Sequence, residues 1–225
     1  TIYIATFLIA YVLPMALTVV VSNQYIWRLD RVETKAMYPT LKPGDTVLVR
    51  KNAYQSSAPT PGQLVAVEAP GDESGSRILR ILADSASASE GPDVRVAGDS
   101  FYIGGQRLEQ RPLDPGAASV SDGEPSKYEL WVERNRDHAY VVSLRPSLKG
   151  KPSYKSTTLD DRELYLLADN RSYPNADDRA TDKVDSRQLG PIRRDRITGQ
   201  PLYIAWSTSP STGEIRWDRI GLRLQ

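Results

Sequence analysis

The sequence predicts a mainly β fold, because short runs of alternating apolar and polar or β-branched residues recur along it, separated by Gly, Pro, Asp and Ser. After the first 27 residues no long stretch shows the helical period. The exception is an apolar stretch at the N-terminus, which predicts one transmembrane helix. The clearest predicted strands read DTVLVRK, GQLVAVEAP, DVRVAG, SFYIGGQRLE, YELWVE, HAYVVSL, ELYLLAD and LYIAWS.

The N-terminal stretch has no charged side chain before Arg28 and consists mostly of Ile, Leu, Val, Ala and aromatic residues. A helix needs about 20 apolar residues to cross the hydrocarbon core of a bilayer, and residues 2–21 supply them. Tyr25 and Trp27 follow, where aromatic side chains often line the membrane interface. We therefore expect a membrane anchor with its interfacial segment over residues 1–27. A cleaved signal peptide and a buried helix of a soluble domain are the alternatives.

The strands after the anchor predict a core domain with a second β lobe inserted into it. We expect residues 28–82 and 164–225 to form the core domain and residues 83–163 to form the inserted lobe. The glycines of YIGGQRL predict a tight hairpin, because glycine adopts positive φ without strain. Two stretches rich in Ser, Pro, Gly and Ala predict exposed loops, ADSASASEGP at 83–92 and PLDPGAASVSDGEPSK at 112–127.

The composition argues against several function classes. Lysine and arginine number 29 against 28 acidic residues, so the chain lacks the large basic field that nucleic-acid binding requires. Without cysteine there is no thiol nucleophile, zinc-cysteine site or disulfide scaffold. Four acidic residues, Asp177, Asp178, Asp182 and Asp185, lack the Asp-x-Asp-x-Asp-Gly turn of a calcium loop, so a solvated loop is favoured. We expect no metal site and no cofactor.

Four motifs along the chain resemble those of one enzyme family. Residues 36–41 read Ala-Met-Tyr-Pro-Thr-Leu, followed by Gly-Asp. This resembles the nucleophile loop of type I signal peptidases, which reads Ser-Met-x-Pro-Thr-Leu shortly after a transmembrane segment. ADNR at 168–171 and DSRQLGPI at 185–192 are similar to the family's Gly-Asp-Asn-Arg and Asp-Ser-Arg-x-x-Gly segments, and EIRWDRIGLRL resembles the C-terminal end of Gram-negative members. The family-motif residues are Met37, Pro39, Thr40, Leu41, Gly44, Asp45, Arg80, Asp169, Asn170, Arg171, Asp185, Ser186, Arg187 and Gly190.

The resemblance implies a serine endopeptidase with a Ser–Lys dyad, in which a desolvated, neutral lysine takes the serine proton. Ala36 stands at the nucleophile position and has no hydroxyl. The base position in ILRILA falls on Leu79, next to Arg80, and leucine cannot accept a proton. A shifted alignment offers Arg77 or Arg80, but a guanidinium stays charged in proteins. Both members of the dyad are therefore missing.

Two further side chains were candidates for a substitute role. Thr34 matches the position at which the family has a serine that helps to hold the oxyanion; the other interpretation is a threonine at a strand end. His138 is the only histidine, and a Ser-His-Asp triad around it is disfavoured against a surface strand histidine. Two more departures affect the site region. Ala168 replaces a family glycine, and residues 172–184 are longer than the family's segment.

These losses predict a membrane-anchored, signal-peptidase-like pseudopeptidase that acts as a binding or structural subunit of a membrane complex. The alternative is a type I signal peptidase, which cleaves signal peptides from exported preproteins, carrying an inactivating Ser-to-Ala change at Ala36. An unrelated β-rich scaffold is a third interpretation. The resemblance implies the bacterial inner membrane, with the ectodomain on the periplasmic side. The expected partners are the membrane and either another membrane protein or an extended peptide bound as an added strand.

Overall fold

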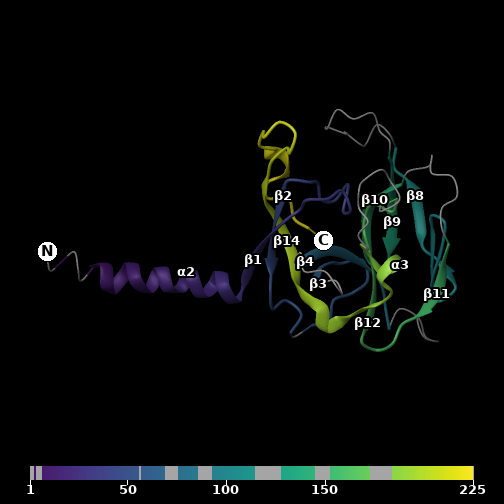
Figure 1. Ribbon diagram of the computed structural model, residues 1–225, viewed down its shortest axis with the longest axis horizontal. Helices are drawn as coiled ribbons and strands as arrows, with labels where there is room; N and C mark the ends of the chain where they lie inside the picture. The colour runs from purple at the N-terminus through teal and green to yellow at the C-terminus, as the bar shows by residue number, and fades with distance from the viewer. Residues whose placement is uncertain are drawn as a thin grey trace.

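Antiparallel β-sheets make up most of the described structure, so the prediction of a mainly β fold is confirmed (Figure 1). The computed structural model describes residues 3, 7–55, 57–68, 76–85, 93–114, 128–144, 153–172 and 184–224.

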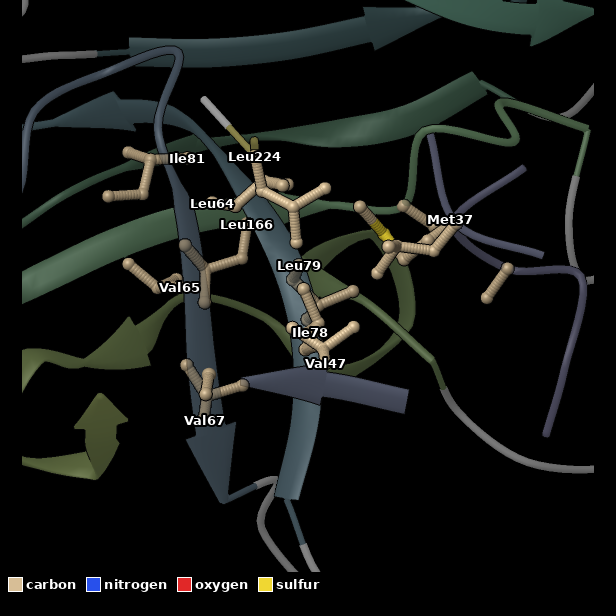
Figure 2. Packing of buried hydrophobic residues seen from close by; sticks show 14 of the residues in the cluster. Met37, Val47, Leu64, Val65, Val67, Ile78, Leu79, Ile81, Leu166 and Leu224 are labelled. Atoms are coloured by element: carbon tan, nitrogen blue, oxygen red, sulfur yellow. The ribbon is translucent and has the colours of Figure 1, made fainter. Parts of the chain in front are cut away.

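The largest sheet has seven strands in the order β1-β2-β14-β3-β4-β12-β13. Their bounds are β1 Trp27–Arg31, β2 Asp45–Arg50, β3 Leu64–Glu68, β4 Ser76–Asp84, β12 Glu163–Leu167, β13 Ile192–Arg193 and β14 Ile197–Ser207. In β2 the valines at 47 and 49 are buried while Leu48 between them is half-buried, as the alternation of its sequence predicts. The inward residues of β2, β3 and β4 form the main hydrophobic cluster with Met37 and Leu224 (Figure 2).

Two smaller sheets hold the residues between β4 and β12 in the chain. One has the order β10-β9-β8, and the other has the order β11-β5-β6-β7. Their bounds are β5 Asp93–Ala97, β6 Ser100–Ile103, β7 Gln106–Arg107, β8 Glu109–Pro112, β9 Glu129–Asn135, β10 His138–Leu144 and β11 Ser153–Thr158. The predicted hairpin is present between β6 and β7, where Gly104 and Gly105 have φ of 56° and 79°.

A second hydrophobic cluster gathers around Phe101 and includes Leu82 and Ala83 of β4 and Leu167 of β12. These two strands therefore contribute to both clusters and connect the large sheet to the smaller ones. The division into a core domain and a lobe inserted at residues 83–163 stays a prediction.

Some elements differ from the sequence expectations. No strand was expected at β1, β8 or β11, since β8 and β11 read EQRP and SYKSTT and lack an apolar alternation. The loop expected from residue 83 begins later, because Ala83 and Asp84 continue β4 and pair with Tyr165 and Leu164. Most of the two expected loops lies outside the described residues.

The N-terminal stretch is helical. A π-helical turn, η1 Leu8–Val12, leads into α2 Leu13–Tyr25, which extends away from the sheets (Figure 1). Pro14 is the second residue of α2, directly after the π-helical turn, and it has no backbone N–H to donate to that turn. Eight large apolar side chains from this segment are exposed: Phe7, Ile9, Tyr11, Val12, Leu13, Met15, Leu17 and Val19. Across the described residues, we find no helix with both the length and the apolar character needed to cross a membrane, so the expected transmembrane helix is not supported.

The junction between α2 and β1 is short and firmly held. Only Ile26 separates the two elements, and its carbonyl accepts a hydrogen bond of 2.8 Å from the backbone N–H of Lys51. The Arg28 guanidinium donates to Ser76 Oγ at 2.7 Å and to Thr198 Oγ1 at 2.9 Å. Ser76 begins β4, and Thr198 lies in β14. Arg28 therefore fixes β1, the first strand after the helix, to two further strands of the sheet.

The start of β2 is tied to the C-terminal part of the chain by a buried carboxylate. Asp45 accepts from Ser207 Oγ at 2.6 Å and from Arg219 Nε at 3.1 Å, and it also pairs with Arg216. Gly44 precedes it with φ of +89°, and a Cβ there would lie 2.0 Å from the carbonyl oxygen of Thr208. Three short helices complete the described fold: α3 Ser186–Leu189, η2 Arg194–Arg196 and η3 Trp217–Arg219.

The close approach of Gly44 to the Thr208 carbonyl predicts that Gly44→Ala destabilises the fold far more than the same change at Gly213. Gly213 also has positive φ, of +74°, but a Cβ there would meet nothing within 4 Å. Gly213→Ala should therefore lower the free energy of unfolding by only about 1–2 kcal/mol, the cost of left-handed backbone. Gly44→Ala adds the collision with Thr208 and should lower it by at least about 3 kcal/mol. Urea unfolding of both variants followed by near-UV circular dichroism measures the difference, and equal losses would contradict the prediction.

Candidate functional site

The nucleophile position lies in the turn that connects β1 and β2. Ala36 is only 7% exposed, and Met37 and Leu41 beside it are buried in the main hydrophobic cluster. Asn170 holds this turn from the other side, because its backbone N–H donates to the Ala36 carbonyl at 2.9 Å and its Nδ2 donates to the Lys35 carbonyl at 3.2 Å. The structure thus brings the first two motifs together around Ala36.

The predicted base position is occupied by the apolar side chain of Leu79. Leu79 lies in β4 opposite Val65 of β3, is 1% exposed, and belongs to the same cluster as Ala36. Figure 2 shows its side chain among those of Ile78 and Val47. An amine at this point would be desolvated, the condition that lowers a lysine pKa, but the leucine offers no proton acceptor. The surroundings suit the family's base, whereas the residue does not.

Arg80, the neighbour of the base position, has a structural contact that occupies its guanidinium. Its Nε and Nη2 each donate to Asp169 at 2.8 Å, and its Nη1 donates to the Gly62 carbonyl at 2.6 Å. The carboxylate of Asp169 also accepts a hydrogen bond from Thr40 Oγ1. This buried pair joins the nucleophile turn, β4 and the Asp-Asn-Arg segment.

The β10-β9-β8 sheet contributes a partner that the sequence analysis does not predict. Glu133 of β9 is fully buried and accepts two hydrogen bonds from Arg171, whose Nη1 also donates to the Ala168 carbonyl at 2.7 Å. Burial alone would lower the pKa of Arg171, but the Glu133 carboxylate outweighs it, and the pKa is raised. The only signal for Glu133 was its inward position in the alternation of β9, where a carboxylate requires a partner.

The third motif, which begins at Asp185, is joined to the Asp-Asn-Arg segment by hydrogen bonds. Asp185 caps α3 by accepting from the Arg187 backbone N–H at 3.1 Å, and it also binds the Arg187 guanidinium and the Ala168 N–H. Ser186 Oγ accepts from the Leu166 N–H at 2.9 Å, and Gly190 ends the helix with φ of 78°. Asp185 is thus paired with arginine. The other three acidic residues considered for calcium lie outside the described residues, and within the described part no cluster suited to a metal ion is found.

The two substitute candidates differ in their surroundings. Thr34 is exposed, and its Oγ1 lies 3.4 Å from the backbone N–H of Ala36, which donates to it. His138 begins β10 and packs against Gly62, where a Cβ would lie 2.5 Å from its own Cβ. Tyr140 of the same strand lies under the Arg80 guanidinium, 4.1 Å from the ring centroid, and burial raises the pKa of its phenol. His138 therefore lies at a packing contact with Gly62.

One side of β4 has a strand neighbour along only part of its length. β3 pairs with β4 from Ser76 to Arg80, whereas β12 pairs with it only from Arg80 to Asp84. In the described part of the chain, the first four residues of β4 therefore have a neighbouring strand on one side only. This stretch includes Leu79.

The comparison with protein families decides the assignment. The model described as "Signal peptidase, peptidase S26" matches residues 4–206. The chain belongs to this family. Among solved structures, this S26 chain is similar to the crystal structure of a signal peptidase I from Enterococcus faecalis, with 18% sequence identity and a TM-score of 0.34; the match covers 64% of this chain and 97% of that one. Among curated protein sequences, none matches. The resemblance predicted from the motifs is thus confirmed, while the roles of the individual S26 motif residues stay predictions.

The buried Arg171–Glu133 ion pair predicts that neutralising Glu133 strongly lowers the free energy of unfolding. Glu133→Gln leaves the Arg171 guanidinium buried without a counter-charge, so we expect the free energy of unfolding to fall by about 3–5 kcal/mol. Glu109→Gln is the matched control, because Glu109 is exposed and pairs with the exposed Arg111. It should change stability by less than about 1 kcal/mol. Thermal unfolding of both variants gives the comparison, and a Glu133→Gln protein as stable as the control would refute this role of the pair.

Proposed function

We propose that this S26 family member is a pseudopeptidase, a protein that binds an extended polypeptide without cleaving it. The observation that carries the proposal is that Ala36 and Leu79, at both dyad positions, are apolar and belong to one buried cluster. Acyl transfer by the family's chemistry needs a hydroxyl at the first position and an amine at the second. Neither group is present.

The frame around these two positions supports a retained binding role. Thr40, Arg80 and Asp169 are joined by buried hydrogen bonds, and Asn170 holds the Ala36 turn. A buried arginine–carboxylate pair is costly to desolvate and requires accurate geometry. The S26 motifs therefore still shape the turn, although the reactive atoms are gone.

The alternative is a type I signal peptidase inactivated only by a Ser-to-Ala change at Ala36. Leu79 argues against it, because a single inactivating change leaves the base in place, whereas this chain has lost the base as well. Leu79 is buried in one hydrophobic cluster with Val65 and Ile78, as expected for a position in an apolar core.

The half-paired stretch of β4 is our candidate for the binding edge. An extended segment that lies beside a strand gains affinity from backbone hydrogen bonds, and these need neither the serine nor the lysine. We infer that a partner strand lies along the first four residues of β4, close to Ala36. Docking through residues 172–184 or through the N-terminal helix is the competing arrangement.

We infer further that the protein works at a bacterial inner membrane with its sheets on the periplasmic side. The eight exposed large apolar side chains from Phe7 to Val19 support this, since burial of apolar surface is favourable by roughly 25 cal/mol per Å². A partner that is itself a membrane protein would present its emerging segment near this surface. Loss of the dyad would protect such a partner from cleavage.

Reversion variants test the loss of activity. Ala36→Ser alone should give no cleavage of a preprotein in detergent, because the members of a catalytic pair act as a unit and the base is still missing. Ala36→Ser with Leu79→Lys should restore weak cleavage, because the added amine would be buried among apolar side chains and held neutral, while the altered glycine positions, such as Ala168, limit the rate. Product detected by mass spectrometry from the single variant would show that the base lies elsewhere than position 79.

Photo-crosslinking tests the partner. A photoreactive residue is placed in separate proteins at position 36, at position 178 or at position 10, and carbonate-washed membranes are irradiated. Crosslinks from position 36 to one membrane protein are the expected result. Crosslinks only from position 178 or position 10 would refute binding beside β4, and no crosslink from any position would refute a stable partner.

A further inference from the structure

The half-paired edge of β4 meets a charged side chain of β1 at its first residue. The Arg28 guanidinium donates through Nη2 to the Ser76 hydroxyl at 2.7 Å, and Ser76 begins the stretch of β4 that pairs with β3 alone in the described part of the chain. Among the described strands, β1 pairs only with β2. Arg28 therefore joins two strands that each have one side without a described strand neighbour.

The backbone of β4 shows where a bound segment would meet this contact. The N–H of Ile81 donates to the Gln63 carbonyl at 2.9 Å, which makes Ile81 a hydrogen-bonded position of the β3–β4 ladder. In an antiparallel pair such positions alternate with positions whose backbone groups point to the other side. The N–H and C=O groups of Ile78 and Ser76 therefore point away from β3. A segment that adds to this side would pair with Ile78 and reach the Arg28 contact at Ser76.

The Arg28 guanidinium has one terminal nitrogen to spare. Its Nε donates to one carboxylate oxygen of Asp30 at 2.6 Å, and its Nη2 is shared among the other oxygen and the hydroxyls of Ser76 and Thr198. Within the described residues, Nη1 has no acceptor. The Arg28 side chain is 29% exposed and that of Asp30 is 11% exposed. Arg28 is thus the more accessible member of the pair, and it retains two N–H donors for a ligand.

The charges around Ser76 favour an acidic group as that ligand. Arg77 is the next residue of β4 and is half-buried. Glu68 is opposite Ser76, but on the side of β3 and away from the half-paired side. A segment that covers guanidinium donors without offering an acceptor binds weakly, because these donors lose water and gain no partner. A carboxylate satisfies them with charge-assisted hydrogen bonds.

We propose that Arg28 is a specificity-determining residue of this binding edge and selects an extended segment that carries a glutamate or aspartate. Asp30 is a positioning residue, because it holds the guanidinium at Ser76. The proposal rests on the proposed function and names what the bound segment must carry. Three strand residues separate Ser76 from Leu79, which is about 10 Å. The acidic side chain therefore lies about three residues from the residue of the segment beside Leu79.

Photo-crosslinking of synthetic peptides to the full chain in detergent tests this selection. The probes are acetylated nonapeptides of alternating valine and serine with benzoylphenylalanine at the centre. A glutamate, a leucine or a lysine stands three residues before or three residues after the centre, so that both directions of the bound segment are covered. Mass spectrometry maps the crosslinks, which we expect in residues 36–41 and 76–80. Glutamate should raise the yield about tenfold over leucine in one of the two placements.

Variants of the ion pair give the decisive comparison. Arg28→Gln leaves Asp30 as an unpaired carboxylate, so the preference should change from glutamate to lysine. Asp30→Asn removes the counter-charge of Arg28 and should increase the preference for glutamate by up to about fivefold. Arg193→Gln is the matched control. Arg193 also pairs with an aspartate two residues on, Asp195, but both are exposed, and its loss should leave the preference unchanged.

The expected result is a preference for glutamate that Arg28→Gln reverses and Asp30→Asn increases. Crosslinks at the β4 edge with equal yields for glutamate and leucine would overturn the selection while leaving peptide binding intact. A lower melting temperature of Arg28→Gln with an unchanged preference would show that Arg28 only braces the strands and would also overturn it. If Arg28→Gln does not fold, an unchanged preference in Asp30→Asn overturns the proposal by itself. The absence of crosslinks in both segments from every probe would refute the proposed binding edge, and this inference with it.

Discussion

The buried pair between Arg80 and Asp169 is the interaction on which the rest of the structure depends. Through it β4, the Ala36 turn and the Asp-Asn-Arg segment meet at one carboxylate, which also accepts from Thr40. Arg171, two residues on, extends the connection to Glu133 in the smaller β10-β9-β8 sheet. Segments far apart in the chain are therefore positioned by a few charged groups, each of which must be paired because it is removed from water.

In the proposed pseudopeptidase, the two predicted dyad positions carry no reactive group, while the contacts around them are ordered. Ala36, Met37 and Leu79 are continuous with the main hydrophobic cluster, so apolar packing extends through the two positions at which the family carries out proton transfer. The pairs around them hold the turn independently of that chemistry. Under the proposed function, a peptidase fold would lose catalysis by substitution at these two positions while the surrounding pairs stay in place.

Much of the β fold could be predicted from the sequence, because hairpins and strands depend on local patterns of residues. The hairpin at Gly104 and Gly105 follows from glycine's tolerance of positive φ, and β2 follows from its alternation. Contacts that depend on the tertiary fold could not be predicted. Glu133 is an ordinary glutamate until the fold brings Arg171 to it, and the polar strand β11 forms because it pairs with β5. The N-terminal stretch was predicted as one spanning helix, whereas the structure has a π-helical turn followed by the 13 residues of α2.

The single residue between α2 and β1 would limit how this protein reaches the proposed membrane partner. A domain on a long flexible tether samples a volume around its anchor, and its effective concentration near a target depends on the tether's length. Here Ile26 is held by Lys51, and the Arg28 guanidinium fixes the following strand to β4 and β14, so the sheets have almost no reach of their own. In a membrane, encounters would then depend on lateral diffusion and on rotation about the helix axis. Only segments that emerge at the height set by this junction would come within contact.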